Sequence, residues 1–170
     1  MALGRGDHAP EFELPAVKGQ ERFTFRSKDY LGRMMLVVTF HPLDWTPTCE
    51  SQVPILNGMR GMFAAAGAQV IDISVDSIES HIAWQEQEIG TMHFPLCSDF
   101  YPHAEVTQKF GILREEPPVA GISERAAFVV DQKGTVRYAQ VYPIDQLPDL
   151  QGLLGEVKKI ASADRSGTAG

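Results

Sequence analysis

The segment FHPLDWTPTC, residues 40–49, decides the fold of this chain because it joins a strand pattern to a helix pattern. The apolar run MMLVVT, residues 34–39, precedes it and predicts a buried strand. The next run, ESQVPILNGM at residues 50–59, carries apolar residues at roughly helical spacing. A strand therefore passes into a short proline-rich loop, and Cys49 stands where the next helix begins.

The position of Cys49 at a helix start has a chemical consequence. Unpaired backbone N–H groups and the positive end of the helix dipole both favour an anion there. These interactions stabilise the thiolate, which is the nucleophilic form of cysteine. Cys49 is therefore a candidate nucleophile, and the alternative is a small buried apolar residue at a helix start.

Pro42, Thr46 and Cys49 form the pattern Pro-x-x-x-Thr-x-x-Cys, which resembles the active-site signature of the peroxiredoxins, the AhpC/TSA family. The resemblance covers about residues 8–160 and includes APEFELP at 9–15, SHIAW at 80–84, FPLCSD at 94–99 and SERAAFVVD at 123–131. The subgroup that the chain most resembles is the AhpE type, on SDFYPH at 98–103 and FGI at 110–112.

The resemblance implies an α/β, thioredoxin-like fold with a mixed central β-sheet, flanking helices and an N-terminal β-hairpin. Strand–helix alternation, followed by a hairpin and a last helix, fits that architecture. We expect one domain over residues 1–160 and a disordered Ser/Gly/Ala-rich tail at Ala161–Gly170. The expected strands are Glu11–Val17, Arg22–Phe25, Met34–Phe40, Ala68–Val75, Phe94–Cys97, Arg125–Asp131 and Thr135–Val141. The expected helices are Thr48–Ala66, a helix to Ile89 after a capping box at Asp76–Glu79, His103–Phe110 and Leu147–Ile160.

Composition excludes several function classes. The formal net charge is −7 and no cluster of Lys and Arg is visible, which disfavours nucleic acid as a partner. No apolar run approaches the ~18 residues of a membrane span, and no signal peptide is supported. Two cysteines in 170 residues are not a disulfide framework, so we expect a cytoplasmic location.

The resemblance implies a thiol-dependent peroxidase without cofactor or metal, which reduces hydrogen peroxide, organic hydroperoxides or peroxynitrite. Cys49 supplies the attacking sulfur, and Thr46 can place its hydroxyl near the sulfur and the peroxide. Pro42 can wall the pocket against water. Arg125 can favour the thiolate and bind the oxygens in the transition state. Taken alone, Thr46 is an ordinary loop residue or helix cap, and Arg125 a surface arginine.

Three residues near Cys49 depart from the commoner family pattern: His41, Gln52 and Thr48, which stands where an aliphatic residue usually precedes the cysteine. Gln52 occupies a place where many relatives carry a glutamate that orients the arginine, and its amide can still accept from Arg125. His41 stands where an aromatic residue is frequent. It is either a proton donor to the leaving group or a structural or partly exposed histidine.

Cys97 is either structural or a second, resolving cysteine that captures the Cys49 sulfenic acid. It takes the place of a leucine on a short strand, where a buried apolar thiol is the expected state. We therefore favour a one-cysteine peroxidase over a two-cysteine cycle. An external thiol must then recycle Cys49: a thioredoxin- or glutaredoxin-like protein, or a low-molecular-weight thiol.

Three rival functions are weaker. A thiol–disulfide oxidoreductase needs Cys-x-x-Cys, which is absent. A metal site at His93 and Cys97, or among His41, Asp44 and Cys49, does not match structural zinc spacing. A non-catalytic binding or chaperone module does not need the threonine, cysteine and arginine together.

A homodimer is expected, because relatives of this kind commonly dimerise around the active site. Large apolar side chains near predicted element ends suit such an interface, and the alternative is that they belong to the core. These residues are Trp45, Trp84, Phe100 and Tyr101.

Overall fold

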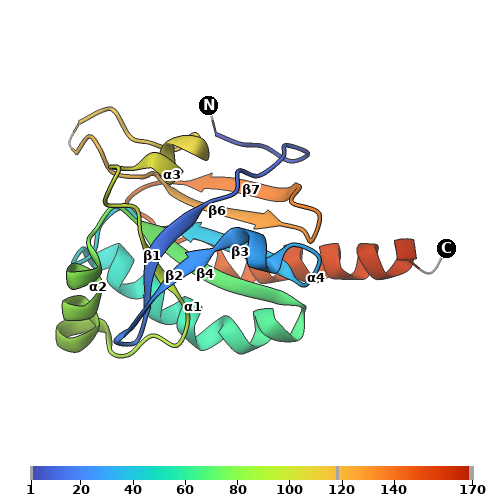
Figure 1. Cartoon of the computed structure of the whole chain (residues 1–170), viewed down its shortest axis with the longest axis horizontal. Helices are drawn as coiled ribbons and strands as arrows, with labels where there is room; N and C mark the ends of the chain where they lie inside the picture. The colour runs from blue at the N-terminus through green and yellow to red at the C-terminus, as the bar shows by residue number, and fades with distance from the viewer. Residues whose placement is uncertain (1, 118, 169–170) are drawn as a thin grey trace.

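The computed structural model describes residues 2–117 and 119–168. The fold is built on a seven-stranded sheet with the strand order β2-β1-β5-β4-β3-β6-β7 (Figure 1). β3, β4 and β5 pair in parallel and the other neighbours pair antiparallel, so the sheet is mixed as predicted. The strands are β1 (Glu13–Lys18), β2 (Glu21–Arg26), β3 (Met35–Phe40), β4 (Ala68–Ser74), β5 (Leu96–Ser98), β6 (Arg125–Val130) and β7 (Val136–Tyr142).

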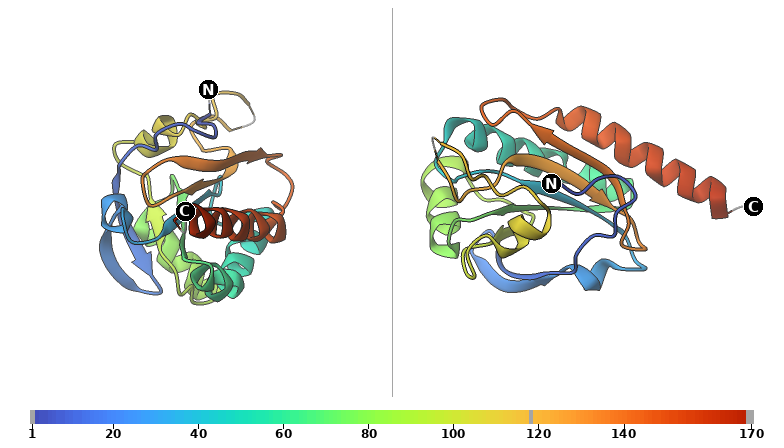
Figure 2. Two further views of the ribbon diagram at one scale, coloured as in Figure 1. Left: turned by 90° about the vertical axis from the view of Figure 1, so that its right-hand side faces the viewer. Right: turned by 90° about the horizontal axis from the view of Figure 1, so that it is seen from above.

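Helices cover both faces of the sheet. α1 and α4 lie together on one face, and α3 lies on the other with the N-terminal segment (Figures 1 and 2). The α-helices are α1 (Pro47–Ala65), α2 (Ile78–Trp84), α3 (Glu105–Lys109) and α4 (Leu150–Thr168). A 3-10 helix, η1 (Ser27–Tyr30), follows β2, and a π-helical turn, η2 (Gln85–Ile89), extends α2. None of the described helices is long and apolar enough to cross a membrane.

β3 explains why the segment before Cys49 is so apolar. The strand lies in the middle of the sheet and all six of its residues are buried. Its side chains alternate between two cores, with Val37 in the core beneath α1 and α4 and Val38 in the core beneath α3. A strand covered by helices on both faces has no polar face, so its sequence is a continuous apolar run.

The predicted N-terminal hairpin is confirmed, since β1 and β2 pair antiparallel. The predicted capping box is only half right. Ser77 caps α2 and accepts a hydrogen bond from the Ser80 N–H, at 3.1 Å. Glu79 instead pairs with Arg22 across the surface, because it sits at the second helical position rather than the third.

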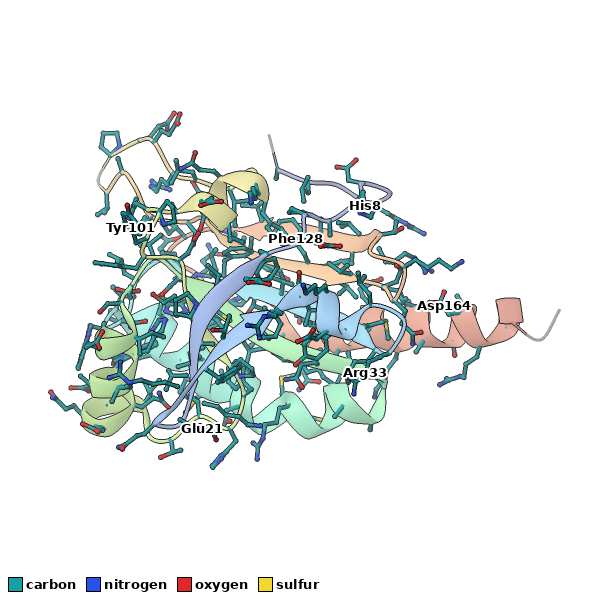
Figure 3. The ribbon with its side chains drawn as sticks, viewed as in Figure 1. His8, Glu21, Arg33, Tyr101, Phe128 and Asp164 are labelled. Atoms are coloured by element: carbon teal, nitrogen blue, oxygen red, sulfur yellow. The ribbon has the colours of Figure 1, made fainter. Side chains whose placement is uncertain are left out.

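The prediction of a disordered tail from Ala161 is wrong as far as Thr168, where α4 ends. Ala161 packs against the core, and Asp164 accepts a hydrogen bond from Arg137 of β7 at 2.9 Å. Figure 3 shows Asp164 on α4. A helix propagates easily once one face is packed, so the small polar residues continue it. Residues 169–170 lie outside the described residues.

Candidate active site

Cys49 occupies the first turn of α1, as predicted. Thr46 is the N-cap of the helix and Pro47 its first residue, where a missing N–H costs nothing. Cys49 is the third helical residue, so the positive end of the helix dipole lies beside its sulfur. Cys49 is 0% exposed.

Arg125 meets this sulfur although it lies 76 residues further along the chain. It is the first residue of β6, which pairs antiparallel with β3 from Ala126 opposite Phe40. The arginine therefore stands just beyond the end of β3, where the loop to Cys49 leaves the sheet. Nη1 and Nη2 of Arg125 each donate to Cys49 Sγ, both at 3.4 Å.

The guanidinium of Arg125 is held on its other side by two acceptors. Nε and Nη2 donate to the Ile144 carbonyl at 3.2 and 2.9 Å. Nη1 donates to Gln52 Oε1 at 2.5 Å, which confirms that the amide of Gln52 accepts from the arginine. With a side chain 2% exposed and every nitrogen bonded, Arg125 presents fixed donors to the sulfur.

Thr46 and Pro42 lie close to Cys49 in the sequence but contribute differently from each other. Pro42 is buried in the loop after β3, and its role as a wall against water stays a prediction. The Thr46 hydroxyl donates its one proton to the Leu43 carbonyl at 2.8 Å. From the sequence we expected this hydroxyl to accept from one of the sulfur and the peroxide and to donate to the other. Because its proton is bonded to Leu43 in this state, it can only accept from a bound peroxide.

A buried network of His41, Asp44, Asp72 and His81 lies behind the site. Asp72 and His81 were not among the candidate residues predicted from the sequence. His41 Nδ1 bonds to Asp72 Oδ1, and its Nε2 lies 2.6 Å from Asp44 Oδ1. His81 Nδ1 lies 2.7 Å from Asp44 Oδ2, and its Nε2 lies 3.0 Å from the Cys97 carbonyl. The sequence signal was a strand with one acidic residue among apolar ones, at Asp72.

Each ring nitrogen in this network faces an oxygen that can only accept. His41 therefore satisfies both of its contacts only when both of its ring nitrogens carry protons. Burial alone would lower the pKa of His41, but the carboxylates of Asp72 and Asp44 outweigh it and raise that pKa well above its usual range. Burial would raise the pKa of Asp44, yet hydrogen bonds from the two histidines hold it well below its usual range.

The same network supplies a group of ligand-type atoms, from His41, Asp44 and His81, within 4.8 Å of one another. These atoms are in direct contact, at 2.6 Å between His41 Nε2 and Asp44 Oδ1 and at 2.7 Å between His81 Nδ1 and Asp44 Oδ2. Two ligands of a tetrahedral zinc ion stand about 3.3 Å apart, given bonds of about 2.0 Å, so the arrangement fits protons better than a metal. The other candidate also fails as a metal site, because His93 is exposed and Cys97 is buried.

Cys97 and Cys49 lie on opposite faces of the sheet. Its side chain belongs to the core beneath α3, whereas Cys49 belongs to the core beneath α1 and α4. The sheet therefore separates the two thiols. Cys97 is 0% exposed, and burial, with the charges of Asp72 and Asp99, raises the pKa of its thiol well above the usual range. Both properties oppose a role as a thiolate nucleophile.

Fold and site together define a class of protein: a thioredoxin-like domain that presents one thiol to an arginine at a helix start. A model of the AhpC/TSA family matches residues 5–139. The chain belongs to this family, the peroxiredoxins. A putative peroxiredoxin in the rubredoxin operon of Clostridium pasteurianum is 39% identical over 147 residues, 82% of this chain and 79% of the relative.

Longer relatives match as well. The chloroplastic 2-Cys peroxiredoxin BAS1 of Spinacia oleracea is 30% identical over 141 residues, 80% of this chain and 51% of the relative. The chain thus spans about half the length of that protein. The reduced 2-Cys peroxiredoxin of Plasmodium vivax shares the fold with a TM-score of 0.90, at 23% identity, over 97% of this chain and 86% of its own. The AhpE-type subgroup stays a prediction.

Proposed function

We propose that this protein is a thiol peroxidase whose nucleophile is Cys49. The observation that carries the proposal is the pair of 3.4 Å contacts from the two terminal nitrogens of Arg125 to Cys49 Sγ. Donors fixed beside a sulfur at a helix start favour the thiolate and remain available to a charged transition state. Hydrogen peroxide, organic hydroperoxides and peroxynitrite all offer the O–O bond that such a thiolate cleaves.

The reaction is a displacement at oxygen. The Cys49 thiolate attacks one peroxide oxygen, an S–O bond forms and the O–O bond breaks. The departing hydroxide or alkoxide takes a proton from water, and the cysteine becomes a sulfenic acid. Arg125 stabilises the charge that moves from sulfur to the leaving oxygen, Thr46 accepts a hydrogen bond from the bound peroxide, and Pro42 limits water in the pocket.

A one-cysteine cycle is the favoured form of this activity. Its support is the placement of Cys97 on the opposite face of the sheet and its complete burial. A first external thiol then condenses with the sulfenic acid, which forms a mixed disulfide at Cys49 and releases water. A second thiol attacks the mixed disulfide, releases the Cys49 thiolate and leaves an external disulfide. The reductant is a thioredoxin- or glutaredoxin-like protein or a low-molecular-weight thiol.

We also propose a homodimer in a reducing, cytoplasmic location. Three of the four large apolar residues considered for the interface support it, with exposed fractions of 41% for Trp45, 56% for Phe100 and 84% for Tyr101. Figure 3 shows Tyr101 at the outer edge of the molecule. Trp84 is 0% exposed and belongs to the core, so it is not an interface residue.

The test is mass spectrometry of the reduced protein after one equivalent of peroxide, with Cys49→Ser as the comparison. A single oxygen added at Cys49, and no reaction in the serine variant, is the expected result, because a hydroxyl is not ionised near neutral pH. Loss of two hydrogens with Cys49 joined to Cys97 would replace the one-cysteine cycle by an internal disulfide. A wild-type protein that leaves peroxide intact would favour a non-catalytic module.

A further inference from the structure

The amide of Gln52 can support Arg125 in only one of its two orientations. Its oxygen must face the guanidinium, which has hydrogen-bond donors and no acceptor. In the structure Oε1 accepts from Arg125 Nη1 at 2.5 Å. A rotated amide would point its own N–H groups at the arginine, and the contact would become a clash of donors. The orientation therefore depends on an acceptor at the Nε2 end of the amide.

Asp72 holds that end. Its Oδ2 accepts from Gln52 Nε2 at 3.3 Å, and the Phe40 carbonyl is a second acceptor at 3.5 Å. Asp72 sits in the middle of β4 and is 0% exposed, so its contacts are not diluted by water. A buried carboxylate accepts on both oxygens and donates on neither, which makes it the side chain that selects this amide orientation.

His41 and Thr39 fix Asp72 in turn. The Thr39 hydroxyl lies 2.5 Å from Asp72 Oδ2 and 2.9 Å from the Ile71 carbonyl. His41 Nδ1 bonds to Asp72 Oδ1, while its Nε2 is held by Asp44. Both oxygens of Asp72 are therefore held, Oδ1 by His41 and Oδ2 by Thr39 and Gln52. The contacts thus run without a break from His41 through Asp72 and Gln52 to Arg125.

We infer that Asp72, supported by His41, is a positioning residue for Arg125, and that it acts by setting the orientation of the Gln52 amide. This inference rests on the proposed peroxidase function of Cys49. Neither Asp72 nor His41 contacts the sulfur through any of its described hydrogen bonds, so their effect reaches it only through Gln52 and Arg125. Asp72 thereby supplies the negative charge that the neutral Gln52 amide lacks, and it acts on Arg125 through that amide.

The charge can be moved along this path without changing its total. Asp72→Asn alone gives residue 72 a donor and an acceptor, which must serve both His41 and Gln52. His41 Nδ1 and Gln52 Nε2 both donate to residue 72, and the single oxygen of the new amide can accept from only one of them. Gln52 therefore loses its fixed orientation. Asp72→Asn combined with Gln52→Glu restores the contacts to His41 and Arg125, because the new amide donates to the new carboxylate and its oxygen still accepts from His41. Only the 3.5 Å contact from residue 52 to the Phe40 carbonyl is lost. In that double variant the carboxylate at position 52 accepts from Arg125 in either orientation.

The experiment is stopped-flow tryptophan fluorescence of wild type, Asp72→Asn, Gln52→Glu and the double variant, mixed with hydrogen peroxide. Asp72→Asn should react about tenfold or more slowly, the loss expected for one hydrogen bond to a charged group. The double variant should return to within about threefold of wild type, because the two substitutions compensate. Asp99→Asn is the matched control, since Asp99 is also buried, and its carboxylate accepts from Thr107 and from the N–H of Val106. Its rate should equal that of wild type.

A second readout is independent of peroxide. Alkylation of Cys49 by iodoacetamide, followed by mass spectrometry, should rank the four proteins in the same order. Thermal unfolding of each variant checks that it folds. Equal rates for wild type and Asp72→Asn would overturn the inference, and so would a double variant as slow as Asp72→Asn. If iodoacetamide alkylates the four proteins in this order but wild type does not react with peroxide, the proposed function fails while the positioning role stands.

Discussion

At the scale of single residues, the site depends on how completely its charges are bonded. Arg125 is buried and makes its hydrogen bonds to the sulfur, to Gln52 and to one carbonyl. A donor group held this way costs little reorganisation when charge develops during the reaction. Arg125 therefore acts through the fixed geometry of its donors as well as through its charge.

Replacing Arg125 by alanine should slow the reaction of Cys49 with peroxide by two orders of magnitude or more, about 3 kcal/mol. Lysine should lose less, because it keeps the charge without the planar pair of donors. Stopped-flow fluorescence measures both rates. Arg22→Ala is the control, because that arginine forms an exposed ion pair with Glu79. A near wild-type rate in Arg125→Ala would remove the arginine from the site.

His41 should make the stability of the protein depend on pH. Its pKa is raised in the folded state, so the folded protein keeps a proton that the unfolded chain releases above about pH 6.5. The stabilisation is complete below that pH and is lost as pH rises toward the folded pKa. The free energy of unfolding should therefore fall as the pH rises above about 6.5, by at most about 1.4 kcal/mol per pH unit for this group.

Urea unfolding at a series of pH values measures this slope. His41→Gln should show a flatter dependence than wild type over the same range, since it has no proton to release. His93→Gln is the control, because its ring is on the surface. A slope that is identical in wild type and His41→Gln would show that His41 is not charged in the folded protein.

At the scale of elements, α2 connects the buried network to the surface. Ser77 caps the helix, and one turn later His81 enters the network and contacts Asp44. Ser80 donates to Asp44 at 2.9 Å and accepts from the Trp45 indole at 3.1 Å, so the helix also holds the loop that precedes Cys49. A short helix that carries these contacts depends on its cap.

Ser77→Ala should lower the free energy of unfolding by about 1 kcal/mol, the usual cost of losing an N-cap. Chemical denaturation measures it. Ser162→Ala, an exposed position within α4, is the control and should be neutral or slightly stabilising, because alanine is the better helix former. Equal losses in the two variants would contradict the capping role.

At the scale of the whole molecule, the sheet itself determines which cysteine chemistry is available. β5 and β3 are separated by β4, and the two thiols point into different cores. A disulfide needs Cα atoms within about 7 Å and side chains that face each other. Joining Cys49 to Cys97 would therefore require part of the sheet to come apart.

Cys97→Leu should leave the rate of peroxide reduction unchanged and cost about 1 kcal/mol or somewhat more in stability from overpacking. After peroxide treatment, wild type and the variant should be labelled equally by a dimedone-type reagent that traps the sulfenic acid. Wild type that escapes labelling, while the leucine variant is labelled and overoxidises, would instead identify Cys97 as the resolving cysteine.

The positions of most elements could be predicted from the sequence, and the tail could not. Buried strands such as β3 and β4 are apolar runs with clear ends, so local pattern is enough to locate them. The C-terminal residues beyond Ala161 looked disordered because their composition is small and polar. Their helix depends on packing of Ala161 and on the bond from Arg137 to Asp164, which composition does not reveal.

The sequence by itself determined the family and the helix start at Cys49, because these depend on short motifs with fixed spacing. The resemblance to the family then indicated that Gln52 could accept a hydrogen bond from Arg125. Only the tertiary structure decided the rest of the site. Asp72 and His81 join it through β4 and α2, and Thr46 turns its proton toward Leu43. The physical reason is that hydrogen bonds between buried side chains depend on where strands and helices bring them together, and sequence separation carries no information about that.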